Sequence, residues 1–172
     1  EGVRDGAAAR AASDALFTDK QGKVSCTLNI ASIDLATNTI VLTRNNPSSF
    51  AICRNGQVDC ISAESVSLGT ARDTRPVISE INIEPGLIIV LHTDGLDHAG
   101  KRRGQPMEVC TVIQSMLDEQ DPSPQSIADE LLAHAFSLDE GRPADDVSVV
   151  VLKVTPRTGD QVRRMTVRLP IE

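Results

Sequence analysis

The hydrophobic pattern of the chain centres on one short apolar run, residues 87–91, which reads Leu-Ile-Ile-Val-Leu. Five residues are too few for a helix, and the lack of alternation indicates that both faces are buried, as in a core strand. A turn sequence, residues 84–86, precedes the run, and Thr93-Asp94-Gly95 closes it. The pattern therefore predicts a central strand with a carboxylate, that of Asp94, in a tight turn at its exit.

A second apolar run, residues 149–152, has its carboxylates at the entry instead, on Asp145 and Asp146. If the two strands are antiparallel neighbours, the end of one lies beside the start of the other. Asp94 and Asp145 would then meet at one rim of a sheet. Two carboxylates beside a dry core repel each other unless a positive charge lies between them, so the pattern indicates a cation site.

Alternating apolar and polar positions predict strands at residues 24–31 and 77–83, and short segments bounded by turn residues predict three more. Asn55-Gly56 predicts a two-residue hairpin between two of them. Together with the central strand they predict an antiparallel meander in the first half of the chain. The predicted strands are residues 24–31, 39–42, 50–53, 57–61 and 77–83.

Three helices are predicted, the first from the high helix propensity of alanine and the other two from the helical spacing of their apolar residues. The first is the alanine-rich segment 7–16 with Asp5 as its N-cap, and the second begins at Pro106. The third begins at Ser123-Pro124, a good pair of N-cap and first-turn residues. Residues 163–169 alternate basic with apolar positions and predict one added edge strand. Strands, then two helices, then a strand indicate an α+β fold.

Composition narrows the class of protein. The 172 residues suit one domain, and no apolar run approaches the ~20 residues of a membrane span. The net charge of -7 and the absence of Trp and Tyr argue against a nucleic-acid partner, while the negative charge permits a cation site. The four cysteines have no zinc-like spacing, so we expect free thiols in a reducing cytoplasm.

The order of these motifs resembles a known family. Glu-Pro-Gly, an apolar strand, Thr-Asp-Gly-Leu, two helices and then Asp-Asp-Val-Ser-Val-Val-Val-Leu is similar to the metal-dependent protein serine/threonine phosphatases of the PPM type. The bacterial branch that contains the sporulation stage II protein E phosphatase is the most similar, and it usually carries a pair like Leu68-Gly69. The opening Glu-Gly-Val-Arg-Asp-Gly-Ala-Ala-Ala resembles its Asp-Gly-x-Gly-x-Gly-x-x-Ala segment. The resemblance covers residues 1–154 as a phosphatase domain and leaves 155–172 as a linker and extra strand.

The resemblance implies a four-layer αββα sandwich with two Mn²⁺ or Mg²⁺ ions at one end. It places metal ligands at Asp94, Asp145, Glu1 and the Gly2 carbonyl, and supporting residues at Asp146 and Gly95. Hard divalent ions take oxygen ligands, so the residue types agree. Two ions ~3.5–4 Å apart activate a water for attack on phosphorus, and no side-chain nucleophile is required.

A histidine near the rim can give a proton to the leaving serine oxygen, and His98 is the candidate. The expected partner is a phosphorylated protein, such as an anti-sigma-factor antagonist in stress signalling.

Two other functions stay open. Where the family has Asp and Gly, this chain has Glu1 and Arg4, and the family's further acidic ligand lies on a strand upstream of this segment. These departures favour a catalytically degenerate domain that binds a regulatory partner. The ligands alone also allow a metal-dependent hydrolase of small phosphoesters. The basic run Lys101-Arg102-Arg103 is either a solvated cluster or a dock for an acidic or phosphorylated partner.

Overall fold

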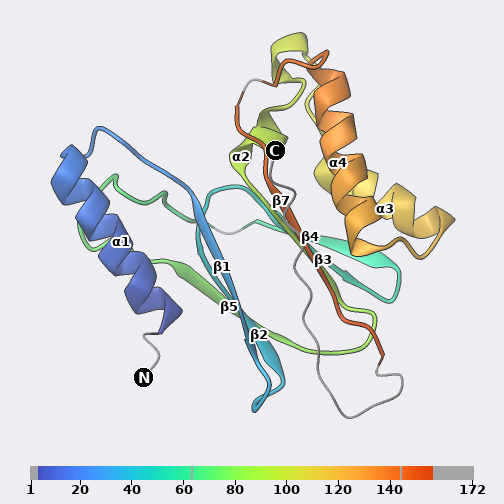
Figure 1. Cartoon of the computed structure of the whole chain (residues 1–172), viewed down its shortest axis with the longest axis horizontal. Coiled ribbons are helices and arrows are strands. Elements are labelled where there is room, and N and C mark those ends of the chain that lie inside the picture. Colours follow the sequence, from blue (N-terminus) through green and yellow to red (C-terminus); the bar gives the residue numbers. More distant parts are fainter. Residues whose placement is uncertain (1–3, 63, 144, 157–172) are drawn as a thin grey trace, which may run out of the picture.

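A computed structural model describes residues 4–62, 64–143 and 145–156, and in this part the chain forms two antiparallel sheets with helices on their outer faces (Figure 1). The first sheet has the order β1-β2-β5 and the second the order β4-β3-β6-β7. The strands are β1 (Leu28–Asp34), β2 (Thr39–Asn45), β3 (Phe50–Arg54), β4 (Gln57–Ile61), β5 (Val77–Asn82), β6 (Ile88–His92) and β7 (Val149–Lys153).

The strands predicted between residues 24 and 152 are present, but the predicted antiparallel meander is wrong. The chain leaves the first sheet after β2, forms the β3–β4 hairpin in the second sheet, and returns for β5. The reason is burial: a single sheet of these strands would leave one apolar face in water, whereas two sheets cover each other. Strand β1 begins later than predicted, at Leu28, because Cys26 makes only an isolated bridge to Leu68.

Alternate residues of β6 belong to two different cores, which explains its unbroken apolar sequence. Ile89 and Leu91 lie in the core between the sheets, whereas Ile88 and Val90 lie in the core between the second sheet and its helices. All four are at most 5% exposed. The prediction of a strand buried on both faces is confirmed.

Helix α1 (Asp5–Lys20) packs on β1 and β2, while α3 (Val109–Glu119) and α4 (Pro124–Leu138) pack on the second sheet. This arrangement gives the four layers that the sequence predicted. Ser123 caps α4 as predicted, by accepting a hydrogen bond from the Ser126 amide at 3.0 Å. Asp5 is not the N-cap of α1, because Arg4 holds that position and the Asp5 carboxylate instead accepts a hydrogen bond from Ser32.

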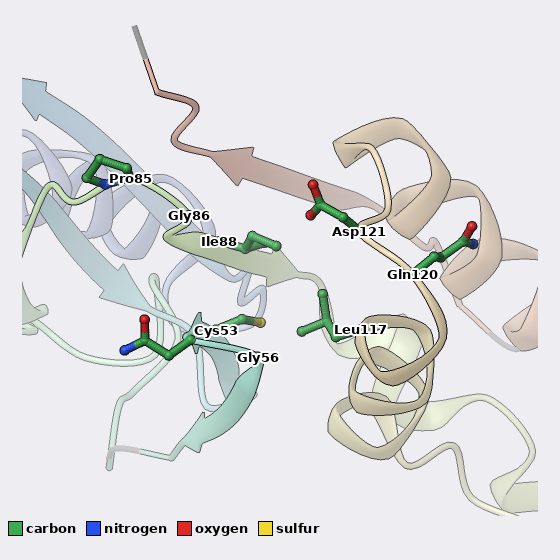
Figure 2. A pocket seen from close by; sticks show the side chains of 9 residues that line it. Cys53, Gly56, Pro85, Gly86, Ile88, Leu117, Gln120 and Asp121 are labelled. Atoms are coloured by element: carbon green, nitrogen blue, oxygen red, sulfur yellow. The ribbon is translucent and has the colours of Figure 1, made fainter.

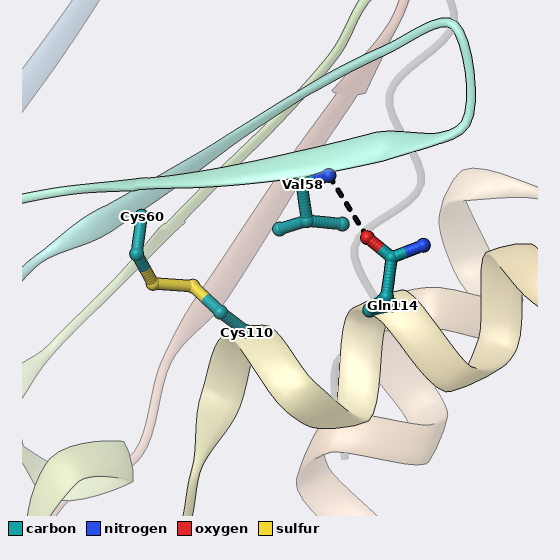
Figure 3. The surroundings of a disulfide bond; sticks show 4 residues. All are labelled: Val58, Cys60, Cys110 and Gln114. Carbon is teal, nitrogen blue, oxygen red and sulfur yellow. Dashed lines mark hydrogen bonds between the residues drawn. A yellow bond between two sulfur atoms is a disulfide. The ribbon is translucent and has the colours of Figure 1, made fainter.

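Helix α3 protects the edge strand β4 of the second sheet. Gln114 accepts a hydrogen bond from the Val58 amide at 3.0 Å, and Cys60 and Cys110 form a disulfide beside it (Figure 3). The prediction of four free thiols is therefore wrong for this pair. Cysteines 50 positions apart gave no sequence signal, and the packing of α3 on β4 brings their Cα atoms to 6.2 Å.

Within the described part, no helix is both long and apolar enough to cross a membrane. The edge strand predicted at residues 163–169 lies outside the described residues.

Candidate functional site

The candidate site lies where β6 ends. Asp94 follows His92 and Thr93 and is the first residue of a short helix, α2 (Asp94–His98). The tight turn predicted at this point is therefore a helical turn. The helix places Asp94 and His98 four residues apart, on the same face, because residues i and i+4 are neighbours on a helix surface.

Strand β7 brings the second carboxylate to the same rim. β6 and β7 are antiparallel, and His92 pairs with Val149, so the segment that leads into β7 lies beside the exit of β6. The prediction that the two strands are antiparallel neighbours is confirmed. Asp145 consequently lies next to α2, although 51 positions separate it from Asp94 in the sequence.

Thr93 fixes the segment before β7 to the end of β6. Its amide donates to the Ser148 carbonyl at 3.1 Å, and its hydroxyl accepts from the Ser148 amide at 3.0 Å. The same hydroxyl donates to the Asp146 carbonyl at 3.1 Å. Sequence reasoning did not assign this role, because the partners of a threonine hydroxyl depend on which segment pairs with its strand.

Gly95 lets α2 approach this segment more closely than any other residue would. A Cβ built on Gly95 would lie 2.3 Å from the Asp146 carbonyl oxygen, far inside contact distance. Gly95 and Asp146, which the sequence predicted as supporting residues, are therefore in contact through their backbone atoms. The Asp146 side chain is exposed.

Asp94, His98 and Asp145 form a cluster with one potential ligand atom each, all within 4.8 Å of one another. Nδ1 of His98 lies 3.7 Å from the Asp145 carboxylate, and these two side chains are 43% and 50% exposed. The site is thus an open rim that a protein-borne group can reach.

The donor set is compatible with a hard divalent ion. Opposite ligands of Mg²⁺ lie about 4.2 Å apart, so small side-chain rotations would bring both carboxylates into its range. Carboxylates are the ligands that Mg²⁺ and Mn²⁺ prefer, whereas imidazole suits softer metals. Ligation by Asp94 and Asp145 stays a prediction, and their proximity is the observation that supports it.

Glu1 and Gly2, the other predicted ligands, lie outside the described residues. The first turn of α1 is held at Ser32, whereas Asn29 of the same strand reaches the His92 carbonyl beside the rim. Three residues of strand span about 10 Å, and Figure 1 shows α1 beside the first sheet, apart from helix α2, which lies beside the start of β7.

A buried polar network holds the end of β6 against the first sheet. The His92 carbonyl accepts from Asn46 at 2.9 Å and from Asn29 at 3.3 Å. Arg44, only 1% exposed, donates to Asn29 at 3.3 Å, and burial lowers the pKa of its guanidinium. The alternation pattern did not predict this network, because it marks polar positions as exposed.

A separate hollow of about 330 Å³ lies at the start of β6, the opposite end of this strand from Asp94 (Figure 2). The side chain of Cys53 lines it together with Leu117 and Asp121. Burial, and then the charge of Asp59, raises the pKa of the Cys53 thiol to about 11. The thiol is therefore protonated at neutral pH and unsuited to act as a nucleophile.

Comparison with known proteins relates this arrangement to a family. The family profile described as Stage II sporulation protein E (SpoIIE) matches residues 2–155. A comparison with curated protein sequences finds no match.

Several solved structures share the fold. The PP2C phosphatase domain of SpoIIE from Bacillus subtilis, solved with a fragment of its regulatory domain, superposes with a TM-score of 0.74 at 19% identity, covering 92% of this chain and 46% of that one. The manganese-presoaked phosphatase domain of the same protein gives 0.61 at 21% identity, with 78% and 58% covered. The catalytic domain of the serine/threonine phosphatase PstP, in complex with two manganese ions, gives 0.62 at 18% identity, with 91% and 74% covered.

The chain thus spans about half the length of these two Bacillus subtilis chains. Since the profile covers nearly the whole sequence and the two-sheet arrangement is that of PP2C phosphatase domains, the chain belongs to the Stage II sporulation protein E family.

Proposed function

We propose that the chain is a protein phosphatase that hydrolyses phosphoserine or phosphothreonine with a water activated by two Mn²⁺ or Mg²⁺ ions. The observation that carries the proposal is the convergence of Asp94 and Asp145 at one open rim. Membership of the family and the shared fold support the same reaction class.

In this proposal the residues of the rim have distinct tasks. Asp94 and Asp145 hold the cations, and Thr93 and Gly95 keep the two carboxylate-bearing segments at a fixed spacing. Cations held by Asp94 and Asp145 would supply positive charge for the phosphoryl oxygens and would lower the pKa of a coordinated water. His98 donates a proton to the leaving serine or threonine oxygen, from a position beside Asp145.

The substrate in this proposal is a phosphorylated signalling protein, such as an anti-sigma-factor antagonist. The half-exposed rim supports a protein substrate, because a phosphorylated loop can reach it without entering a deep cavity. A cytoplasmic location would follow from such a partner.

A second candidate is a catalytically degenerate domain that binds a regulatory partner. One observation favours it, the small number of oxygen ligands at the rim. Among the described residues, only the carboxylates of Asp94 and Asp145 contribute oxygen ligands to the cluster. Two carboxylates are few for a pair of ions, which usually share more oxygen ligands.

The test measures turnover of p-nitrophenyl phosphate and of a phosphothreonine peptide with Mn²⁺ and with EDTA. We expect Asp94→Asn and Asp145→Asn to lower turnover on the order of 100-fold or more, because each removes a cation ligand. Asp19→Asn, an exposed change on α1, serves as the matched control. Turnover that survives both EDTA and Asp94→Asn would refute the mechanism. Mn²⁺ binding without turnover would favour the degenerate domain.

A further inference from the structure

A group of four cationic side chains, which we call the basic platform, lies beside the rim. Lys101, Arg102 and Arg103 form a short 3-10 helix, η1 (Lys101–Arg103), directly after α2, and Arg142 lies in the turn after α4. All four are exposed. The three arginines line a hollow of about 550 Å³ together with Asp139 and Glu140.

The backbone beneath the platform is tightly fixed. Asp139, 7% exposed, accepts a hydrogen bond from the Gly100 amide at 3.0 Å, and its own carbonyl accepts from the Arg142 amide at 3.0 Å. Gly100 has a φ of +72°, and a Cβ there would lie 2.0 Å from the Gln105 carbonyl oxygen. The two parts of the platform are therefore held in one arrangement, which lowers the entropy cost of binding a ligand.

Most of the positive charge of the platform has no ion-pair partner. Within the described residues only Arg103 has one, the carboxylate of Glu140, and this hydrogen bond and charge lower the pKa of Glu140. Lys101, Arg102 and Arg142 form no ion pair with any described carboxylate. This concentration of positive charge stands out in a chain whose net charge is -7.

Both parts of the platform lead directly into the candidate site. Lys101 follows His98 by three residues, and Arg142 precedes Asp145 by three residues. Three residues span at most about 11 Å, so the Cα atoms of Lys101 and Arg142 lie within that distance of the Cα atoms of His98 and Asp145. Figure 1 shows α2 and the C-terminal end of α4 at the same end of the molecule.

We propose that the basic platform binds acidic side chains that flank the phosphorylated residue of the protein substrate. This inference rests on the proposed function and adds a sequence preference to it. An extended peptide advances about 3.3 Å per residue, so a span of about 11 Å corresponds to three residues. The preferred substrates carry Asp or Glu two to four positions from the phosphoserine or phosphothreonine.

The experiment measures kcat/KM of the Mn²⁺-loaded chain for the hydrolysis of two phosphothreonine peptides. One carries Glu at the positions two to four residues from the phosphothreonine, and the other carries Gln at the same positions. We expect kcat/KM to be about fivefold to tenfold higher for the acidic peptide, which is what two or three exposed charge pairs supply. The difference should reside mainly in KM and shrink at high salt.

The double variant Arg102→Gln/Arg142→Gln should reduce this ratio to near one. The double variant Arg10→Gln/Arg75→Gln is the matched control, since these arginines line a different hollow beside α1. The control should keep the wild-type ratio, although the net charge changes by the same amount.

Fluorescence anisotropy of the same labelled peptides separates this proposal from the proposed function. If the chain turns over neither peptide, the phosphatase proposal fails, and tighter binding of the acidic peptide that only Arg102→Gln/Arg142→Gln abolishes still supports the platform. Equal kcat/KM and equal binding of the two peptides by the wild type would overturn the platform. A ratio that both double variants lower equally would also overturn it, because the effect would then be one of net charge.

Discussion

Gly95→Ala is the sharpest test of how the rim is held together. The added methyl group would lie 2.3 Å from the Asp146 carbonyl oxygen, and ordinary contact begins at 3.4 Å. Relief of the overlap requires α2 and the Asp146 segment to separate by about 1 Å. Neither side yields easily, because the obstructing atom belongs to the backbone and Thr93 holds the same segment.

The expected effect on activity is larger than the effect on stability. A misplacement of 1 Å in a catalytic arrangement can cost about 100-fold, and we expect a loss of that order in Mn²⁺-dependent kcat/KM. Overpacking costs about 1–3 kcal/mol, from which the better helix propensity of alanine removes about 1 kcal/mol. The remaining loss of up to about 2 kcal/mol corresponds to a fall in Tm of at most about 8 °C.

The measurements are phosphatase kinetics, Mn²⁺ binding by titration calorimetry, and a thermal melt. Gly6→Ala on α1 is the matched control, because its Cβ would meet only side-chain atoms, the end of Ile78 at 3.2 Å and Pro76 at 3.7 Å. That variant should keep wild-type Mn²⁺ affinity and gain up to about 1 kcal/mol in stability. Wild-type Mn²⁺ affinity and kcat/KM in Gly95→Ala would refute the view that close approach of the two segments builds the site.

Three further predictions concern the surrounding fold. Thr93→Val keeps the shape of the side chain but removes the hydroxyl that bridges two backbone groups, and should lower the free energy of unfolding by about 1–2 kcal/mol in urea denaturation. An unchanged free energy of unfolding would contradict this role of Thr93. Removal of the disulfide by Cys110→Ser opens a loop of about 50 residues and should lower the free energy of unfolding by up to about 4 kcal/mol, whereas Cys26→Ser, the control, should have little effect. The raised pKa of Cys53, about 11 against 9.0, means that the folded state holds the thiol proton longer than the unfolded state, so stability should fall as pH rises from 9 to 11. The loss should reach about 2–3 kcal/mol and be absent in Cys53→Ala, and equal pH dependence of the two proteins would contradict it.

Short-range patterns were enough to predict most of the helices and strands and the proximity of Asp94 and Asp145. The hairpin at Asn55-Gly56 and the cap at Ser123 depend on residues a few positions apart, so local sequence is informative. The apolar run of β6 indicated a buried strand, which is confirmed, whereas the same expectation for β7 is wrong, because β7 lies at the edge of its sheet among the described residues and Val150 is 53% exposed. The antiparallel pairing of the two strands implied that Asp94 and Asp145 meet. The family motifs added the expectation of a metal-dependent phosphatase.

Other features depend on which segments pack together, and alternation carries no information about that. The chain crosses between sheets after β2, and α3 reaches β4 so that Cys60 and Cys110 pair. The hydroxyl of Thr93 finds its partners 53 and 55 positions away. Arg103 likewise acquires Glu140 as its neighbour only through folding. The same packing brings the 3-10 helix η1 and the turn after α4 together as the basic platform. Hydrogen bonds and ion pairs form between whichever groups the buried cores bring within a few ångströms, and core packing is a property of the whole chain.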